Sequence, residues 1–327
     1  MASIQKRKDV WQVRVRVTGL PTLVRSFDSR KSAQVWANEK DNEQLRGVYR
    51  DESDVQKTTL SQLIDRYLVD VTPLMKSAAV DAYKLRALQQ RTLSHLPLSK
   101  LTPSVLAQHR DLRLRAVTNG TVIRELAYIS SVINHARREW AVNIPNPVAL
   151  VKKPVSPQGR DRILEPEEMS ALLAELTPSG RRSPWMLPIV QMALETAMRR
   201  GELLALQWKH INLREQVAVL QTTKNGERRI VPLSMRAVAT LEGLPRNCGD
   251  RVFPMSACAV SAAFERAAER ASLVDLHFHD LRHTAITQMA DKLPNVIELA
   301  AVSGHKSLKM LQRYYHPSPQ ALALKLG

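Results

Sequence analysis

Four residues near the C-terminal end of the chain are of types that can act together on a phosphodiester. His279 and Arg282 stand three positions apart, so a helix would place both side chains on one face. His305 and Tyr314 follow at intervals that let two further short helices return to that face. A cationic face suits an anion with several oxygens. A phenol beside it, with no evident metal ligands, predicts covalent attack on phosphorus.

The sequence around these four residues predicts the helices and strands that must position them. Residues 184–199 are apolar enough for a buried helix, which would end at Arg199. Residues 217–221 and 228–233 are expected to form two short strands. The segment between them contains Asn225-Gly226, a strong hairpin signal, which would hold Lys224 near the turn. Residues 165–168 start a helix well, with acids in the first turn.

Residues 1–54 are expected to form a small separate module. Apolar residues alternate with polar ones from Trp11 to residue 18, which predicts a strand with one apolar and one basic face. Residues 22–27 predict a second strand, and a helix follows. A two- or three-stranded sheet backed by this helix would leave Arg14, Arg16 and Arg25 facing outward. Such a ribbon can enter a DNA groove, and a solvated basic face fits equally well.

Residues 58–155 predict an all-helical domain. An apolar stripe with helical spacing runs over residues 60–68, and Asn119-Gly120 is expected to end the third helix before Thr121 caps the fourth. Among the basic residues of this region, Lys84, Arg86 and Arg91 suit contacts to DNA phosphates as a set. Each one alone is better explained by surface solubility.

Residues 144–162 are rich in proline and basic residues, which predicts an extended linker. Lys152 and Lys153 on such a linker could cross a duplex between two domains, although an ordinary tether has the same composition. The domain beyond the linker is expected to span residues 160–327. It would contain most of the groups that can do chemistry.

The charge balance favours a polyanionic partner. The chain of 327 residues has 48 Lys and Arg against 31 Asp and Glu, a formal net charge of +17 spread along its length. Nucleic acid is favoured over a membrane surface. Its two cysteines have no metal-ligand spacing and are expected to be free thiols. No signal peptide or apolar run of membrane-spanning length is present, which predicts a soluble, cytoplasmic protein in a bacterium or phage-infected cell.

Five fragments in order resemble the tyrosine recombinase/integrase family, most closely over residues 160–316. They are Glu195-Thr-Ala-Met-Arg199-Arg-Gly-Glu202, Thr223-Lys224-Asn-Gly, His279-Asp-Leu-Arg282-His-Thr284, Ser303-Gly-His305 and Tyr314. The resemblance implies a mainly α protein with small β-sheets and three domains. These are an arm-type DNA-binding module, a helical core-binding domain and a mixed, mostly α catalytic domain. One departure is Ala197, where the family often has glycine.

The resemblance also implies roles for the site. Arg199 and Arg282 would hold the non-bridging phosphate oxygens, with His279 and His305 adding hydrogen bonds and one histidine helping to deprotonate Tyr314. Lys224 would protonate the leaving 5′-oxygen. Tyr314 would form a 3′-phosphotyrosyl ester, so rejoining needs no cofactor, ATP or metal. Arg228 competes with Lys224, and Tyr315 competes with Tyr314; family spacing selects Tyr314.

The expected function is integration or excision of a phage or other mobile element at specific attachment sites in double-stranded DNA. Homo-oligomers are implied, with a dimer on each site and a tetramer in synapsis. Accessory DNA-bending proteins are a further expected partner. Two other interpretations remain: a catalytically silent DNA-binding protein, and a type IB topoisomerase, which shares the phosphotyrosine chemistry.

Overall fold

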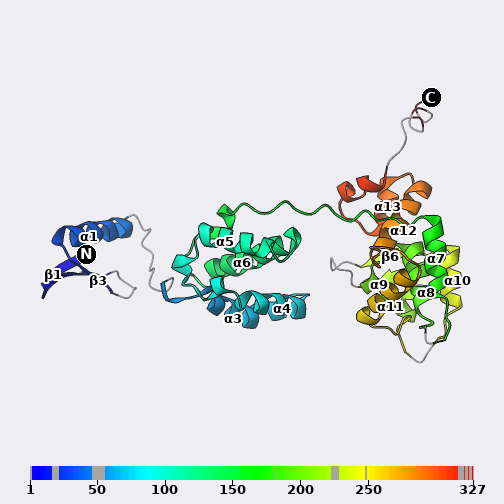
Figure 1. Cartoon of the computed structure of the whole chain (residues 1–327), viewed down its shortest axis with the longest axis horizontal. Helices are drawn as coiled ribbons and strands as arrows, with labels where there is room; N and C mark the ends of the chain where they lie inside the picture. Colours follow the sequence, from blue (N-terminus) through cyan, green and yellow to red (C-terminus); the bar gives the residue numbers. More distant parts are fainter. Residues whose placement is uncertain are drawn as a thin grey trace. The chain divides into compact units, whose positions relative to one another are not determined.

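The computed structural model of the chain (Figure 1) describes residues 2–16, 22–45, 56–180, 182–221, 228–246 and 249–315, together with positions 320, 323 and 326. The chain divides into two compact units, Met1–Gln158 and Gly159–Gly327. Each unit is described by itself. The division falls within the linker that the sequence predicts.

The first part of unit 1 is a three-stranded antiparallel sheet covered by one helix. Val13 and Val15 point from the middle strand into a small core, where Ala33 and Ala37 of the helix meet them. The sheet order is β1-β2-β3, so the alternation predicted from Trp11 onward is confirmed. The elements are β1 Ala2–Arg7, β2 Val10–Val15, β3 Leu23–Phe27 and α1 Arg30–Leu45.

Arg25 is exposed, but it does not lie on the face of the sheet that the sequence predicts. Arg25 pairs with the buried Val13 across the sheet, so both side chains lie on the face that α1 covers. The Arg25 guanidinium is 5.4 Å from the ring centroid of Phe27 and 5.9 Å from that of Trp36. The error arose because Gly19-Leu20-Pro21 breaks the alternation, and the register of β3 cannot be counted across that break.

The remainder of unit 1 is a helical bundle, as predicted. Leu60 and Ile64 of α3 pack with Leu126 and Ile133 of α6, and all four are fully buried. Thr59 and Gln62 form a reciprocal capping box at the start of α3. The helices are α3 Leu60–Asp70, α4 Ala78–Gln89, α5 Pro103–Leu114 and α6 Asn119–Glu139, with 3-10 turns η1 Thr72–Leu74, η2 Thr92–His95, η3 Leu98–Lys100 and η4 Pro147–Leu150.

Two sequence-based boundaries in the bundle are wrong. Helix α6 begins at Asn119 with Thr118 as its N-cap residue, so Asn119-Gly120 opens this helix. The linker is also shorter than predicted, because Ile144, Val148 and Val151 are buried in the bundle core. The chain stays on the bundle beyond this point, because the Lys152 and Val155 carbonyls accept hydrogen bonds from Arg110 at 2.7 Å and from Asn119 at 3.0 Å.

Unit 2 is mostly helical and contains one small antiparallel sheet of order β4-β5-β6. Helix α8 contacts α7, α10, α11 and α12, while α12 also contacts α13 and η7. The elements are α7 Pro166–Leu176, α8 Met186–Thr196, α9 Arg200–Leu204, η5 Trp208–His210, β4 Ile211–Asn212, β5 Val217–Leu220, β6 Arg229–Pro232, α10 Met235–Glu242, α11 Ala257–Arg270, α12 Asp280–Lys292, α13 Val296–Ser303, η6 Leu308–Met310 and η7 Gln312–Tyr314.

Most predicted elements of unit 2 are confirmed. Helix α7 starts after Glu165, and the Glu168 side chain accepts a hydrogen bond from the Glu165 backbone N–H at 3.0 Å. Strands β5 and β6 pair as expected, although the predicted turn between them lies outside the described residues. Cys258 is an exposed free thiol, and Cys248 lies outside the described part. Among the described helices, none is long and apolar enough to cross a membrane.

Candidate active site

Arg282 is the most buried cation of the candidate site, at 4% exposed. It lies in the first turn of α12, and its guanidinium donates hydrogen bonds to the backbone carbonyls of Ala197 and Ser303. One guanidinium thereby joins the end of α8 to the end of α13. Burial, and then the nearby charge of Arg199, lower the pKa of Arg282 to about 10, so it remains a cation at neutral pH.

Arg199 is held beside Arg282 by a buried carboxylate. The side chain of Glu202, 6% exposed, accepts hydrogen bonds from the Arg199 backbone N–H at 3.0 Å and from its Nη1 at 2.9 Å. Burial alone would raise the pKa of Glu202. The backbone hydrogen bond from Arg199 and the charges of Arg229 and Arg199 outweigh burial, so the pKa lies below its usual value. Glu202 is therefore an anion that orients Arg199.

Arg229 is a third guanidinium at the site, and the sequence interpretation missed it. Its Nη2 donates to Glu202 at 2.8 Å and its Nη1 to the Val302 carbonyl at 2.7 Å. The detectable signal was strand alternation: Arg229 and the buried Val231 lie on the same face of β6, whereas Arg228 is exposed. The guanidiniums of Arg199, Arg229 and Arg282 and the carboxylate of Glu202 form the guanidinium cluster. Its surplus positive charge suits a phosphate.

Tyr314 reaches this cluster from η7. Its Oη lies 2.5 Å from Nδ1 of His283, and its ring packs on the small apolar cluster of α12 and α13. Burial raises the pKa of Tyr314, while the charges of Arg313 and Arg282 oppose that effect. The neighbouring Tyr315 instead donates its hydroxyl hydrogen bond to the Leu293 carbonyl. The two adjacent tyrosines thus have different partners, and the phenol of Tyr314 is the one in the cluster.

The two predicted histidines occupy different positions. His305 is half-buried, and its Nδ1 lies 2.8 Å from Ser303 Oγ. Burial, then the charges of Arg282 and Arg199, lower the pKa of His305 to about 4. His279 is exposed at the N-cap position of α12, with its ring 5.3 Å from that of His283. The structure therefore brings Arg199, Arg282, His305 and Tyr314 together, with His279 exposed beside His283.

Lys224 lies outside the described residues, so its predicted place at the hairpin tip stays a prediction. The strands on either side are described and pair from Val217↔Pro232 to Leu220↔Arg229. Arg229, the first residue of β6, is fixed to Glu202. The base of the hairpin is therefore anchored at the guanidinium cluster.

The predicted DNA-contacting residues all lie in unit 1, outside this cluster. Arg14 is half-buried and Arg16 is exposed, while Arg25 lies at the rim of the α1-covered face. Of the others, Arg91 is half-buried, and the exposed ones are Lys84, Arg86, Lys152 and Lys153. Their exposure is compatible with phosphate contacts and with a solvated surface alike.

The end of the linker fixes the start of α12. Arg160 donates to both carboxylate oxygens of the fully buried Asp280, at 3.1 and 2.9 Å, and also to Asp275. Arg313, next to Tyr314, donates to the Arg160 backbone carbonyl at 2.9 Å. The linker, the helix with Arg282 and the segment with Tyr314 are thus joined through one arginine.

Ala197 and Gly304 both have left-handed backbone conformations, with φ of 50° and 70°. Glycine is the residue that adopts this region without strain. Ala197, where the family often has glycine, therefore occupies a position at which glycine would avoid backbone strain. At Gly304 an added Cβ would also lie 2.6 Å from Arg229 Nη1.

We expect Gly304→Ala to destabilise unit 2 and to displace Arg229. The left-handed conformation alone costs an alanine roughly 1–2 kcal/mol, and the collision with Arg229 adds to this. Gly180→Ala is the matched control, since Gly180 has φ of 57° but nothing within 4 Å of its added Cβ. Urea denaturation should give a larger loss of unfolding free energy for Gly304→Ala. Equal losses of unfolding free energy for the two variants would mean that the Arg229 side chain moves away from the added methyl group at no cost.

Stability should also depend on pH through the two half-buried histidines of the site. Burial lowers the pKa of both His283 and His305 to about 4, against 6.5 for a free histidine. The unfolded chain therefore binds protons below pH 6.5 while the folded chain stays neutral at these positions, so stability falls as pH drops toward 4. Thermal melting between pH 6.5 and 5 should show this decline, and His305→Gln should make it shallower, with His283 keeping the remainder. A pH-independent melting temperature over this range contradicts the expectation.

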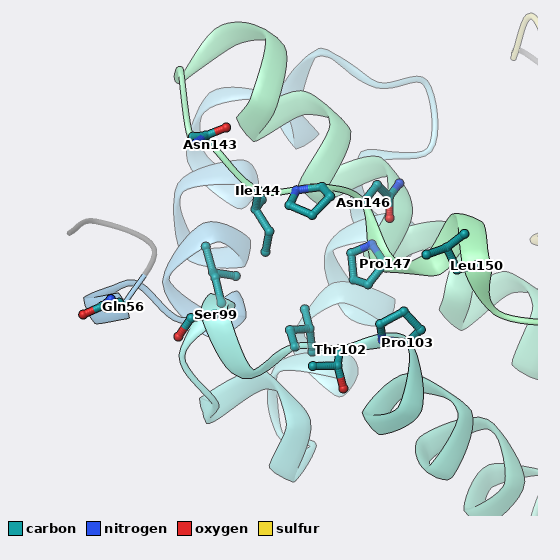
Figure 2. Close-up of a pocket in the computed structure, with 12 residues that line it drawn as sticks. Gln56, Ser99, Thr102, Pro103, Asn143, Ile144, Asn146, Pro147 and Leu150 are labelled. Atoms are coloured by element: carbon teal, nitrogen blue, oxygen red, sulfur yellow. The ribbon is translucent and has the colours of Figure 1, made fainter. Parts of the chain in front are cut away.

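A separate hollow of about 330 Å³ lies in the bundle of unit 1 (Figure 2). Ile144, Pro147 and Leu150 face Ser99 and Thr102 across it, and its lining has no charged side chain. It offers no acid, base or cation, so the chemistry is assigned to unit 2.

Comparison with known proteins agrees with the geometry. The sequence profile of the phage integrase family matches residues 162–321. The chain is 40% identical over 282 residues to a shufflon-specific DNA recombinase of Escherichia coli, covering 83% of this chain and 72% of that protein. It is 30% identical to a putative integrase/recombinase of Haemophilus influenzae, covering 99% of this chain and 90% of the relative.

The fold is similar to that of lambda integrase. A lambda integrase dimer bound to a COC′ core site aligns with a TM-score of 0.66 at 21% identity, over 95% of this chain and 93% of the other. A lambda integrase tetramer bound to a Holliday junction gives a TM-score of 0.66 at 19% identity, over 96% and 94%. At these identities the likeness establishes the fold alone.

Proposed function

Since this chain belongs to the phage integrase family of tyrosine recombinases, we propose that it cleaves and rejoins DNA at specific sites with Tyr314 as nucleophile. The observation that supports this most is the placement of the Tyr314 hydroxyl in a cluster with surplus positive charge, while the Tyr315 hydroxyl is bound to Leu293. As a tyrosine-type site-specific recombinase, the enzyme would conserve the energy of the broken phosphodiester in a 3′-phosphotyrosyl bond.

The proposed roles follow from charge and geometry. Arg282 and Arg199 stabilise the charge that develops on the non-bridging oxygens as phosphorus becomes pentacoordinate. Both are pre-oriented, Arg282 by two backbone carbonyls and Arg199 by Glu202. His305 and His279 donate further hydrogen bonds to those oxygens. Lys224, on the sequence pattern, protonates the departing 5′-oxygen.

The proposed partner is double-stranded DNA with a specific attachment site, bound by a homo-oligomer. The net charge of +17 supports the first part. The dimer on a core site and the tetramer on a Holliday junction, known for the structurally similar lambda integrase, support a dimer per site and a tetramer in synapsis. The sheet module of unit 1 would act as an arm-type DNA reader, and Lys84, Arg86 and Arg91 would contact backbone phosphates. Accessory DNA-bending proteins remain part of this proposal.

The biological substrate is proposed to be a phage or other mobile element that is integrated or excised. The relative named a putative integrase/recombinase, similar over nearly the whole chain, supports this. A shufflon-like DNA segment is the second candidate, because the relative at 40% identity is a shufflon-specific recombinase. Sequencing the DNA that flanks the gene would separate the two. Direct repeats on both sides support an integrated element.

The proposed function is tested by covalent trapping. A nicked suicide duplex with the flanking repeat should give a protein–DNA adduct that survives denaturing gel electrophoresis, and a scrambled duplex should not. A DNA-binding protein without catalysis would give retarded complexes but no adduct. A type IB topoisomerase would relax a plasmid that lacks the repeat, and this result would overturn site-specific recombination.

A further inference from the structure

His283 is in direct contact with the tyrosine hydroxyl, and the proposed function gives it no role. Its Nδ1 lies 2.5 Å from Tyr314 Oη, and the two rings stack with centroids 5.9 Å apart. The imidazole is half-buried on α12, directly after Arg282. A short contact to the attacking oxygen is the geometry that a general base requires.

The surroundings of His283 keep its imidazole neutral before DNA arrives. Burial, then the positive potential of His279 and Arg313, lower the pKa of His283 to about 4, Arg282 adds to this, and Asp280 opposes it. His305 also faces this group. A neutral imidazole can accept a proton at Nδ1 when its own hydrogen is on Nε2. A bound phosphate would compensate the surrounding cations and make the imidazole more basic as the reaction begins.

The other two histidines are less well placed for this step. Nδ1 of His305 is occupied by Ser303 Oγ, and its ring centroid is 6.5 Å from that of Tyr314. His279 is exposed one turn before His283.

We infer that His283 is the general base that takes the proton from Tyr314 as its oxygen attacks phosphorus. This rests on the proposed function, because it assigns a further catalytic residue to the same reaction. The Tyr314 O–H bond breaks and its proton moves to His283 Nδ1. The Tyr314 oxygen bonds to phosphorus, and the 5′-oxygen departs with a proton from the acid proposed above, Lys224. On rejoining, the His283 imidazolium returns its proton to the departing tyrosine oxygen.

The experiment compares His283→Asn with the unmutated full-length protein in single-turnover cleavage of the suicide duplex. Asparagine can keep a hydrogen bond to the phenol but cannot take its proton. Cleavage should slow by roughly 10²–10⁴-fold, with unchanged DNA affinity and melting temperature. His283→Gln is a second variant in case the first folds poorly. His95→Asn, an exposed histidine in unit 1, is the matched control and should cleave normally.

Two rescues separate a base from a residue that only positions Tyr314. A fluorinated tyrosine at position 314 loses its proton more readily, so it should restore much of the cleavage by His283→Asn. A 5′-bridging sulfur in the substrate leaves without protonation, so it should rescue Lys224→Ala but not His283→Asn.

Normal cleavage by His283→Asn, or its rescue by the sulfur substrate, would overturn the role of His283. Either result would leave the proposed function intact as long as the unmutated protein forms the adduct. Absence of any adduct from the unmutated protein on the flanking repeat would count against the proposed function itself.

Discussion

Replacing Tyr314 with phenylalanine is expected to abolish covalent attachment to DNA. The change removes one oxygen and keeps the ring that packs on Ala285, Ile286 and Leu299. Without a nucleophile, cleavage should fall by more than about 10⁴-fold, while specific DNA binding is retained. Single-turnover cleavage of the suicide duplex and gel retardation measure the two quantities separately.

Tyr315→Phe is the matched control for this prediction. It removes the same atom from the adjacent residue and breaks the hydrogen bond to the Leu293 carbonyl. We expect a stability loss of about 1 kcal/mol with cleavage largely preserved. If Tyr315→Phe were inactive and Tyr314→Phe active, the nucleophile would be Tyr315, and the assignment of Tyr314 would be wrong.

Arg282→Lys is expected to have the second largest effect, although it retains the charge. A lysine cannot donate to the carbonyls of Ala197 and Ser303 and also face a phosphate, because it lacks the planar fork of donors. Loss of charge stabilisation at the reacting phosphate should slow cleavage by roughly 10³-fold. The lysine also leaves one buried backbone carbonyl without its hydrogen-bond donor. This should lower the free energy of unfolding by roughly 1–3 kcal/mol.

Arg236→Lys serves as the control, since the Arg236 side chain is 88% exposed on α10. It should leave both cleavage and urea denaturation unchanged. The result that opposes our account is normal cleavage by Arg282→Lys with reduced stability, because Arg282 would then only join α8 to α13.

The fold was predictable where periodicity is strong and local. The stripe from Leu60, the acidic start of α7 and the alternation in β2 each correspond to the elements observed. The failures depend on long-range packing. Ile144 and Val148 sit in a proline-rich stretch that reads as a tether, yet their burial against the bundle decides its structure. The register of β3 depends on strand pairing, which local alternation does not encode.

The site was predictable in its residue types and less so in its contacts. Motif spacing identifies Arg199, Arg282, His305 and Tyr314, and the structure places these side chains in one cluster. Spacing could not reveal Arg229, because its partners are a carboxylate 27 positions earlier and a carbonyl 73 positions later. His283 was hidden for the same reason: its contact to Tyr314 spans 31 positions and depends on how η7 packs on α12.

The central claim is that one phenolic oxygen takes over the DNA strand end, and peptide mapping of the trapped adduct tests it most directly. The suicide complex formed by the unmutated protein would be digested with protease and nuclease, and the nucleotide-modified residue located by mass spectrometry. We predict a 3′-phosphonucleotide on Tyr314 alone. A nucleotide on Tyr315, on a serine or on any other side chain would contradict the account.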